Sequence, residues 1–444
     1  MKSFYLSCLY RVFQMQLILF LTPPVFSITI QDAFDSALRS DPTLRASRFS
    51  QDASSENITI AKSRFLPQIA LQGSSNQLIQ NTTQDVPGNG SMSRSFRGPS
   101  VNHQFVIKQA ILRPRDSAAI GVAELQAQFG KVKYQADTFD LWIRVVNAWI
   151  ELVGSMQLVE SYEKPLQLLL VAVKQENTKF LEGDGTKDAI IEAEAQYQFA
   201  LAIYQQSLHA LNGKKQIFRL LTQFEVDSTF STKLELNPCF VFTEKDRDRL
   251  WMQAREKSME LQLAEIQEQM QRERTRMVKA DHLPTLDFLA TVTTAKNDAT
   301  STQGYRYQNN QIGIQYMIPV YSGGSISAAE RQAAMELEAS MANSEALANR
   351  LDADFGTLWS AWLGQRSRVQ AGFLLLESSK EHLKSTQLAY TYGVKTLMEL
   401  ANAELALSRR LADQINIVME YQKYTAKLSK TDFNLNEKKL NCRY

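Results

Sequence analysis

Two stretches in the middle of the chain alternate between apolar and polar positions. The apolar positions are Leu286, Phe288, Ala290 and Val292 in the first stretch, and Ile312, Ile314, Tyr316, Ile318 and Val320 in the second. The polar segment 297–310 separates them. A period of two sends successive side chains to opposite faces of a strand. The two stretches therefore predict a hairpin whose strands have one apolar and one polar face.

A long segment without proline follows this hairpin. After the break at residues 322–324, residues 327–392 contain no proline over 66 positions. As a single helix this segment would be about 100 Å long, at roughly 1.5 Å per residue. A hairpin attached to so long a helix is not expected in a compact soluble domain. It is typical of a membrane barrel carried on a helical stalk.

The chain contains an internal repeat, with residues 29–222 echoed by residues 246–430. The offset is 217 positions up to the first strand and 210 after the hairpin. Matching positions include Leu66-Pro67 with Leu283-Pro284, Trp149 with Trp359, and Gly183 with Gly393. A fixed offset over long spans indicates duplication. The change in offset assigns the first copy a longer loop, at residues 76–100.

The repeat predicts the same elements in each copy. The expected helices are 30–64, 116–181 and 187–221 in the first copy, and 246–279, 327–392 and 396–428 in the second. The second strand of each hairpin is expected at 101–112 and 311–321. The chain divides into a first repeat (28–224), a linker (225–245), a second repeat (246–430) and a tail (431–444). The fold class is therefore mainly α with a small β part.

The first 27 residues differ from the rest of the chain. Lys2 and Arg11 precede an apolar core at 12–21, and small residues follow up to Ser27. This order is typical of a secretory signal peptide, with cleavage near Ser27. One of the three cysteines, Cys8, lies in this segment. The spacing of the other two, Cys239 and Cys442, leaves open whether they form a disulfide.

Charge and motifs exclude several function classes. The 49 basic and 47 acidic residues nearly balance, so neither nucleic acid nor an acidic partner is indicated. The four histidines show no metal-ligand spacing, and no metalloprotease, phosphate-loop or nucleophile-elbow motif occurs. We therefore expect no enzyme activity, no catalytic residues, no cofactor and no metal.

If the chain spans a membrane, the lipid limits how many copies must assemble. No interior run reaches the ~20 apolar residues of a spanning helix, and lipid accepts only helices and closed barrels. Four strands per chain are too few, because a barrel needs about eight. Three chains give twelve strands and a lumen, although composition alone also permits two chains.

Several motifs occur in a fixed order along the chain. They are Leu66-Pro67-Gln68 and Leu283-Pro284-Thr285 before the strands, the segment from Ile318 to Gly324 after them, and the segment from Tyr390 to Val394 at the second helical turn. In this order they resemble the TolC family of outer-membrane efflux ducts. The resemblance implies a trimeric 12-stranded outer-membrane β-barrel, embedded in outer-membrane lipid. A periplasmic α-helical coiled-coil tunnel continues it. It also implies two partners, a periplasmic adaptor and an inner-membrane transporter.

The first helical turn, at residues 180–188, resembles the branch of the family that serves type I secretion. In that branch an ABC exporter passes unfolded proteins out of the cell. The sequence leaves alternatives open: a drug or metal efflux duct with a proton-driven pump, a stand-alone porin, and a periplasmic coiled-coil scaffold. Neither the cargo nor the resting state of the channel follows from the residues.

The resemblance also implies two sets of site residues. The closing aperture corresponds to Tyr390, Lys395, Glu399 and Asn402, of which only the tyrosine keeps the family pattern. The adaptor-docking turns correspond to Phe180, Leu181, Glu182 and Gly183, and to Tyr392, Gly393 and Val394. In addition, Tyr305, Tyr307 and Tyr316 suit an aromatic girdle at the lipid boundary.

Overall fold

The computed structural model describes residues 29–88, 90–226, 233–236, 242–297 and 305–428. The expected signal peptide, the tail 431–444, Cys239 and Cys442 lie outside these residues. In chain order the elements are α2 (Ile30–Ser40), α3 (Pro42–Ser63), β1 (Gln68–Val86), β2 (Gly90–Leu112), α4 (Pro114–Glu182), α5 (Lys187–Thr222), η1 (Glu244–Asp246), α6 (Arg247–Glu256), α7 (Met259–Lys279), η2 (Ala280–His282), β3 (Thr285–Asn297), β4 (Tyr305–Met317), α8 (Ser325–Thr391) and α9 (Leu397–Leu428). The mainly helical fold with a small β part is confirmed.

The chain forms two compact units, and both repeats contribute to each. The sheet unit comprises Thr43–Asp137 and Lys257–Ala353. The helical unit comprises Met1–Pro42, Thr138–Glu256 and Asp354–Tyr444. Here the two names refer to the described residues of each unit.

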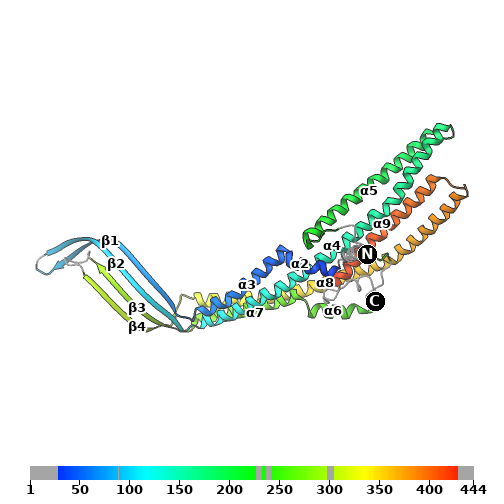
Figure 1. Ribbon diagram of the computed structural model, residues 1–444. Helices are drawn as coiled ribbons and strands as arrows, with labels where there is room; N and C mark the ends of the chain where they lie inside the picture. The colour runs from blue at the N-terminus through cyan, green and yellow to red at the C-terminus, as the bar shows by residue number, and fades with distance from the viewer. Residues whose placement is uncertain (1–28, 89, 227–232, 237–241, 298–304, 429–444) are drawn as a thin grey trace, which may run out of the picture. The chain divides into compact units, whose positions relative to one another are not determined.

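The sheet unit is built on one four-stranded antiparallel sheet with the order β1-β2-β3-β4. Four helical segments adjoin the same end of this sheet, the base: α3 precedes β1, α4 follows β2, α7 leads through η2 into β3, and α8 follows β4 (Figure 1). The strand order leaves β1 and β4 as the two edges of the sheet. Unpaired edges of this kind can hydrogen-bond to further strands.

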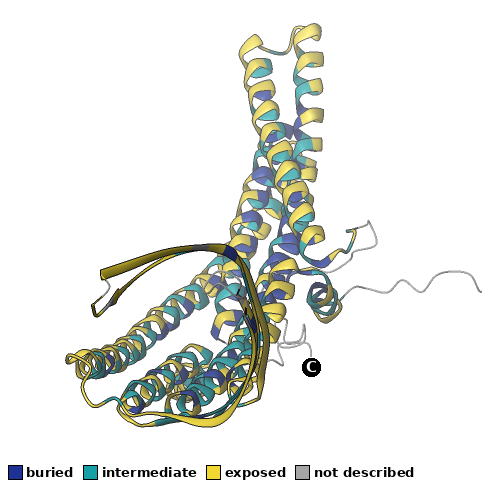
Figure 2. Cartoon of the chain, turned by 90° about the vertical axis from the view of Figure 1, so that its left-hand side faces the viewer, coloured by how far each residue is buried: buried dark blue, intermediate teal, exposed yellow. Residues whose placement is uncertain are grey.

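The two faces of the sheet differ as the alternating pattern predicts. Residues directly opposite in antiparallel strands share a face, and the register places the apolar side chains together. They are Ile69, Leu71, Phe105, Ile107, Leu286, Phe288, Ala290, Val292, Ile312, Ile314 and Tyr316. The sheet curves (Figure 2). On the apolar face Ile312 is 79% exposed, whereas Asp287 on the polar face is 7% exposed.

The register also corrects the tyrosine girdle. Tyr316 lies opposite Leu286 on the apolar face, but Tyr307 lies opposite Ala295 on the polar face. Nine positions separate the two tyrosines, and an odd separation in a strand puts them on opposite faces. A girdle that includes both Tyr307 and Tyr316 is therefore wrong.

The predicted loop at residues 76–100 is also wrong. β1 and β2 continue to Val86 and Gly90, so residues 77–86 and 90–99 pair only with each other. This ribbon extends past the last pair between β2 and β3, Ser100 with Asn297. The ribbon has no apolar face, so side-chain periodicity does not reveal it, although backbone hydrogen bonds hold it.

The predicted helices hold, except for the first of each repeat. Segment 30–64 divides into α2 and α3, because Asp41 precedes a proline and takes an extended conformation (φ −66°, ψ 119°). Segment 246–279 divides before Ser258, whose hydroxyl accepts from the N–H of Leu261 at 3.2 Å and caps α7. The other four helices match the prediction to within two residues at each end.

The helical unit has an aromatic core between α8 and α9. Trp359 stacks on Trp362, with ring centroids 5.1 Å apart, and Tyr421 lies 6.0 Å beyond. The indole N–H of Trp362 donates to the Thr425 hydroxyl at 3.1 Å. Nearer the turns, Leu169 of α4 packs with α5 and α9. The two hairpins α4–α5 and α8–α9 are thus joined within one core. Of the helices described, none is long and apolar enough to span a bilayer.

Candidate functional site at the two helical turns

The turn between α4 and α5 requires glycine at two positions. Gly183 has φ +88°, a conformation that glycine adopts readily. The N–H of Asp184 donates to the carbonyl of Lys179 at 2.9 Å, which closes the last turn of α4. At Gly185, a Cβ atom would lie 2.7 Å from the backbone nitrogen of Phe180. The reversal therefore depends on both glycines.

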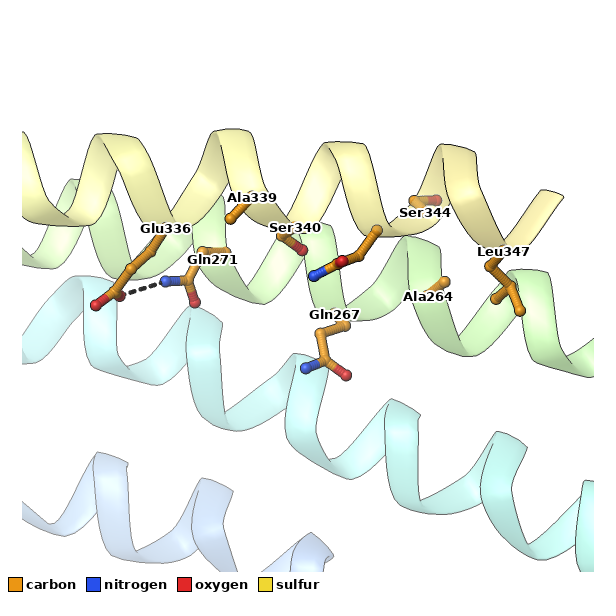
Figure 3. Close-up of a pocket in the computed structure, with 9 residues that line it drawn as sticks. Ala264, Gln267, Gln271, Glu336, Ala339, Ser340, Ser344 and Leu347 are labelled. Carbon is orange, nitrogen blue, oxygen red and sulfur yellow. Dashed lines mark hydrogen bonds between the residues drawn. The ribbon is translucent and has the colours of Figure 1, made fainter. Parts of the chain in front are cut away.

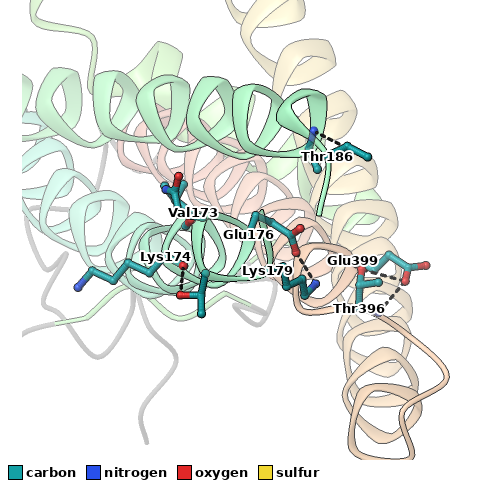
Figure 4. Close-up of polar contacts among 10 residues, drawn as sticks. Val173, Lys174, Glu176, Lys179, Thr186, Thr396 and Glu399 are labelled. Carbon is teal, nitrogen blue, oxygen red and sulfur yellow. Dashed lines mark hydrogen bonds and ion pairs between the residues drawn. The ribbon is translucent and has the colours of Figure 1, made fainter. Parts of the chain in front are cut away.

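Thr186 begins the return helix α5. Its hydroxyl accepts from the N–H of Ala189 at 3.3 Å, as Figure 4 shows. Thr186 is therefore the N-cap of α5. Before the turn, in the last turns of α4, Lys179 and Glu176 form an ion pair of 2.6 Å (Figure 4).

The turn between α8 and α9 repeats this design. Gly393 has φ +72°, and the N–H of Val394 donates to the carbonyl of Ala389 at 2.9 Å. Thr396 and Glu399 then form a reciprocal cap. The N–H of Glu399 donates to the Thr396 hydroxyl at 3.2 Å, and the Glu399 carboxylate accepts from the N–H of Thr396 at 2.8 Å (Figure 4).

This cap gives Glu399 a local structural role. The hydrogen bond from the Thr396 N–H, followed by the bond from its hydroxyl, lowers the pKa of the Glu399 carboxyl. The carboxylate lies in solvent and stays charged at neutral pH. The resemblance also implies that Glu399 lies in the aperture. If so, the same side chain both caps α9 and lies in the aperture.

The four predicted aperture residues lie at one end of one hairpin. Tyr390 ends α8, Lys395 lies in the turn, and Glu399 and Asn402 are in the first two turns of α9. Tyr390 is half-buried and belongs to a cluster with Ala172 of α4 and with Leu397 and Leu400 of α9. Lys395 and Asn402 are half-buried as well. Thus Tyr390 lies where the two hairpins pack against each other.

The predicted docking residues expose apolar side chains. Leu181 is 85% exposed and Tyr392 is 82% exposed, and Phe180 and Val394 are also exposed. Each turn therefore presents two apolar side chains to solvent next to a positive-φ glycine. Apolar groups placed together at a tip are typical of a protein contact.

A groove of about 410 Å³ lies between α7 and α8 in the sheet unit (Figure 3). Small side chains of α8, among them Ala339 and Ser340, face Ala264 of α7. Its one charged group, Glu336, accepts a hydrogen bond from Gln271 at 2.7 Å. A single engaged carboxylate offers no acid–base pair. Across the described residues, no three His, Cys, Asp or Glu side chains are placed to hold a metal.

Comparisons with known proteins agree with this architecture. Residues 250–431 match the family model described as outer membrane efflux protein. The chain is 23% identical over 388 residues to the proteases secretion protein PrtF of Dickeya chrysanthemi, covering 84% of this chain and 81% of PrtF. It is 22% identical to the alkaline protease secretion protein AprF of Pseudomonas aeruginosa, over 88% and 81% of the two chains.

The fold has close counterparts among solved structures. The Campylobacter jejuni CmeC outer membrane channel superposes with a TM-score of 0.70 at 15% identity, over 90% of this chain and 85% of that one. The open state of the Neisseria gonorrhoeae MtrE outer membrane channel gives 0.70 at 16% identity, over 91% and 88%. The chain is thus similar, in sequence and in fold, to outer-membrane efflux proteins of the TolC family. The motif-based resemblance is confirmed.

The match to the outer membrane efflux protein family model covers one of the two turns. The matched range includes the complete second turn and the predicted aperture, and the exposed first turn lies in the other repeat. The aperture and docking roles themselves stay predictions.

Two residues near the turns, Thr396 and Glu404, were missed. Thr396 with Glu399 fits the known pattern of a capping box and could have been found. Glu404 is half-buried in α9, and burial raises the pKa of its carboxyl against the opposing effect of Lys164. Burial of this kind is visible only once the helices are packed.

Proposed function

We propose that this chain forms, as a homotrimer, the outer-membrane exit duct of a type I protein-secretion system. The observation that carries the proposal is the sheet: four antiparallel strands with one apolar face, one polar face and two open edges. Three copies supply twelve strands and pair β1 of one chain with β4 of the next. With that pairing, the backbone N–H and C=O groups of every edge strand are hydrogen-bonded in lipid.

The polar face of the sheet then lines the lumen. The helical part of each chain stands in the periplasm, and the trimer encloses a tunnel there. The two relatives named for protease secretion, PrtF and AprF, each align over more than four fifths of this chain, which favours secreted proteins as cargo. The duct does no chemistry of its own.

The two helical turns are the proposed docking site for a periplasmic adaptor. Leu181 and Tyr392 are the most exposed large side chains there, and an adaptor that covers them would bury apolar surface. Through the adaptor the duct joins an inner-membrane ABC exporter. Lys395 and Tyr390 would hold the closed aperture at the same end of the molecule.

Secretion can be tested in cells that lack their own duct but contain an ABC exporter and an adaptor for a secreted protease. The duct is expected to restore protease to the medium. Leu181→Lys should abolish both secretion and cross-linking to the adaptor. Leu374→Lys, on the exposed side of α8, is the matched control and should retain both.

A second candidate function is small-molecule efflux, which the name of the matching family model favours. Dye accumulation in the same cells, supplied with a proton-driven pump, separates the two. Restored dye efflux without protease secretion would reject the type I assignment and leave the duct assignment intact.

A further inference from the structure

The linker between the two repeats is hydrogen-bonded to both helical hairpins. Its described residues 233–236, here called the linker segment, bond to α4 and to α9. All the residues involved belong to the helical unit. The segment therefore connects the first hairpin, α4–α5, to the second hairpin, α8–α9.

The contact of the linker segment with α4 depends on one amide side chain. Gln157 donates to the carbonyl of Leu234 at 3.3 Å and accepts from the N–H of Leu234 at 3.2 Å. One turn further along α4, Glu160 accepts from Nζ of Lys233 through both carboxylate oxygens, each at 2.8 Å. Both side chains of this ion pair are exposed, so it contributes little. The pairing of Gln157 with Leu234 is therefore the stronger part of the contact.

The contact with the second hairpin is buried. Gln414 of α9 is 1% exposed. Its amide nitrogen donates to the carbonyl of Leu236 at 2.8 Å and to the carbonyl of Val369 in α8 at 3.2 Å. Gly372 of α8 makes room for this amide, because a Cβ atom there would collide with Oε1 of Gln414. One side chain thus joins the linker segment, α8 and α9.

Apolar packing adds to the attachment of the linker to the second hairpin. Phe242 lies edge-on to Trp362 of α8, with ring centroids 6.0 Å apart, and shares a buried cluster with Tyr421 of α9. Burying a large apolar side chain contributes more free energy than one net hydrogen bond. The linker is therefore held more firmly by α8–α9 than by α4, and the bonds at Gln157 are the weaker attachment.

The two hairpins also meet directly, nearer the turns, where Leu169 and Ala172 of α4 pack on α9. Packed helices can slide by small amounts along one another, whereas a hydrogen bond has to keep its length and direction. The bonds at Gln157 and Gln414 therefore restrict how far α9 can shift along α4. Gln157 is 26 residues from Gly183, or about 39 Å along the helix, so a small tilt at the linker becomes a large displacement at the turns.

We propose that the linker segment limits the relative movement of the two hairpins, and that release of Leu234 from Gln157 lets the channel open at the turns. During this movement Leu236 and Phe242 stay on α8–α9 while Leu234 leaves α4. The inference rests on the proposed function, in which the hairpins close the duct at that end.

The test measures single-channel currents of the full chain, as trimers inserted in planar bilayers. Gln157→Leu removes both hydrogen bonds to Leu234 and keeps a side chain of similar size. The ratio of open to closed time should rise roughly thirtyfold, which corresponds to two net hydrogen bonds of about 1 kcal/mol each. In hydrogen-exchange mass spectrometry, the N–H of Leu234 should exchange faster in this variant than in the wild type.

The matched control is Gln167→Leu. Gln167 is exposed on the same helix, ten residues further along. This variant should leave the open time and the exchange of the Leu234 N–H as they are in the wild type.

A crosslink between the linker segment and α4 supplies the reverse test. Cys239 and Cys442 are first replaced by serine, and Glu160→Cys with Lys233→Cys are then joined by a bismaleimide at their exposed site. The crosslink should return Gln157→Leu to the open time of the wild type. In the chain that keeps Gln157, the crosslink should lower the open time.

Three results would overturn the proposal. The first is an equal open time in Gln157→Leu and the wild type. The second is unchanged exchange of the Leu234 N–H in that variant, and the third is a crosslinked chain that opens as readily as the uncrosslinked one. If Gln157→Leu does not assemble, the crosslink in the chain that keeps Gln157 decides. Failure of the wild type itself to insert as trimers rejects the outer-membrane duct instead.

Discussion

Arg113 and Asp287 join the two repeats at the base of the sheet through a two-pronged ion pair. Nε of Arg113 lies 2.8 Å from Oδ1 of Asp287, and Nη2 lies 2.5 Å from Oδ2. Asp287 is almost fully buried on the polar face of β3, and Lys108 lies 3.4 Å from the same carboxylate. The pair links the end of β2 to the start of β3, where strands give way to helices.

Replacing Arg113 by lysine should destabilise the protein. Lysine is a point charge and cannot donate two parallel hydrogen bonds to one carboxylate. The buried carboxylate would lose part of its compensation, so we expect a loss of about 2 kcal/mol. Thermal unfolding of the purified protein in detergent measures it.

The matched control for this prediction is Arg115→Lys. Arg115 pairs with Asp281 near the same end of the sheet, but both side chains are more exposed. Exposed pairs contribute less than about 1 kcal/mol. If both variants lose the same stability, the two parallel hydrogen bonds to Asp287 do not contribute more than an exposed ion pair does.

Glu151 connects three helices of the helical unit and should make stability pH-dependent. Its carboxylate lies 2.7 Å from Nζ of Lys214 on α5 and 2.8 Å from Nζ of Lys423 on α9. Burial alone would raise the pKa of Glu151, but the hydrogen bonds from the two lysines outweigh it and lower that pKa. A carboxyl group with a lowered folded pKa stabilises the fold above its unfolded pKa. This stabilisation is lost as the pH falls through the folded value.

Glu151→Gln should therefore cost about 1 kcal/mol at pH 7, a small figure because solvent screens a half-buried group. The difference from the wild type should shrink as the pH falls below 4.5, the ordinary pKa of the carboxyl. Denaturant unfolding between pH 3 and 8 measures it. Glu160→Gln is the control, since Glu160 pairs with Lys233 at an exposed site. A pH-independent difference at Glu151 would contradict the ion-pair argument.

The sequence predicted the elements whose side chains repeat, and it missed contacts that depend on packing. The alternation from Leu286 to Val292 predicted both faces of β3, because one face is apolar and the other is polar. The ribbon beyond Ser100 was missed, since both of its faces are polar and no period marks it. The Arg113–Asp287 pair spans 174 positions, and no local pattern connects such distant residues. Likewise, the turn glycines were found by their repeat, but their separate physical roles required coordinates.

Glycine substitutions at the helical turns should block export without preventing assembly. Gly183 and Gly393 have positive φ, which costs other residues about 1–2 kcal/mol. At Gly185 a methyl group would collide with the backbone of Phe180. We expect Gly183→Val and Gly393→Val to abolish secretion into the medium, because the exposed apolar side chains at each tip would be displaced.

Both valine variants should still form trimers. Trimers are detected by their heat-modifiable mobility on gels. Gly213→Ala is the control, because Gly213 is inside α5 with open space where a Cβ would be. Alanine there should stabilise the helix by up to about 1 kcal/mol and leave secretion unchanged. Normal export by both valine variants would reject a docking role for the turns.

The last prediction separates the charge of Glu399 from its role as a cap. Glu399→Gln keeps an oxygen that can accept from the Thr396 N–H, whereas Glu399→Ala removes the side-chain acceptor. If the three Glu399 carboxylates of a trimer form a ring on the axis, both variants should alter cation selectivity in planar bilayers. If Glu399 serves only as a cap, glutamine should behave like the wild type and alanine should weaken the start of α9 by about 1 kcal/mol.

Lys395→Ala completes the comparison: it leaves the cap intact, and it should raise single-channel conductance if Lys395 holds the aperture closed. Unchanged conductance in Lys395→Ala would remove that residue from the aperture, and unchanged selectivity in Glu399→Gln would leave Glu399 a purely structural residue.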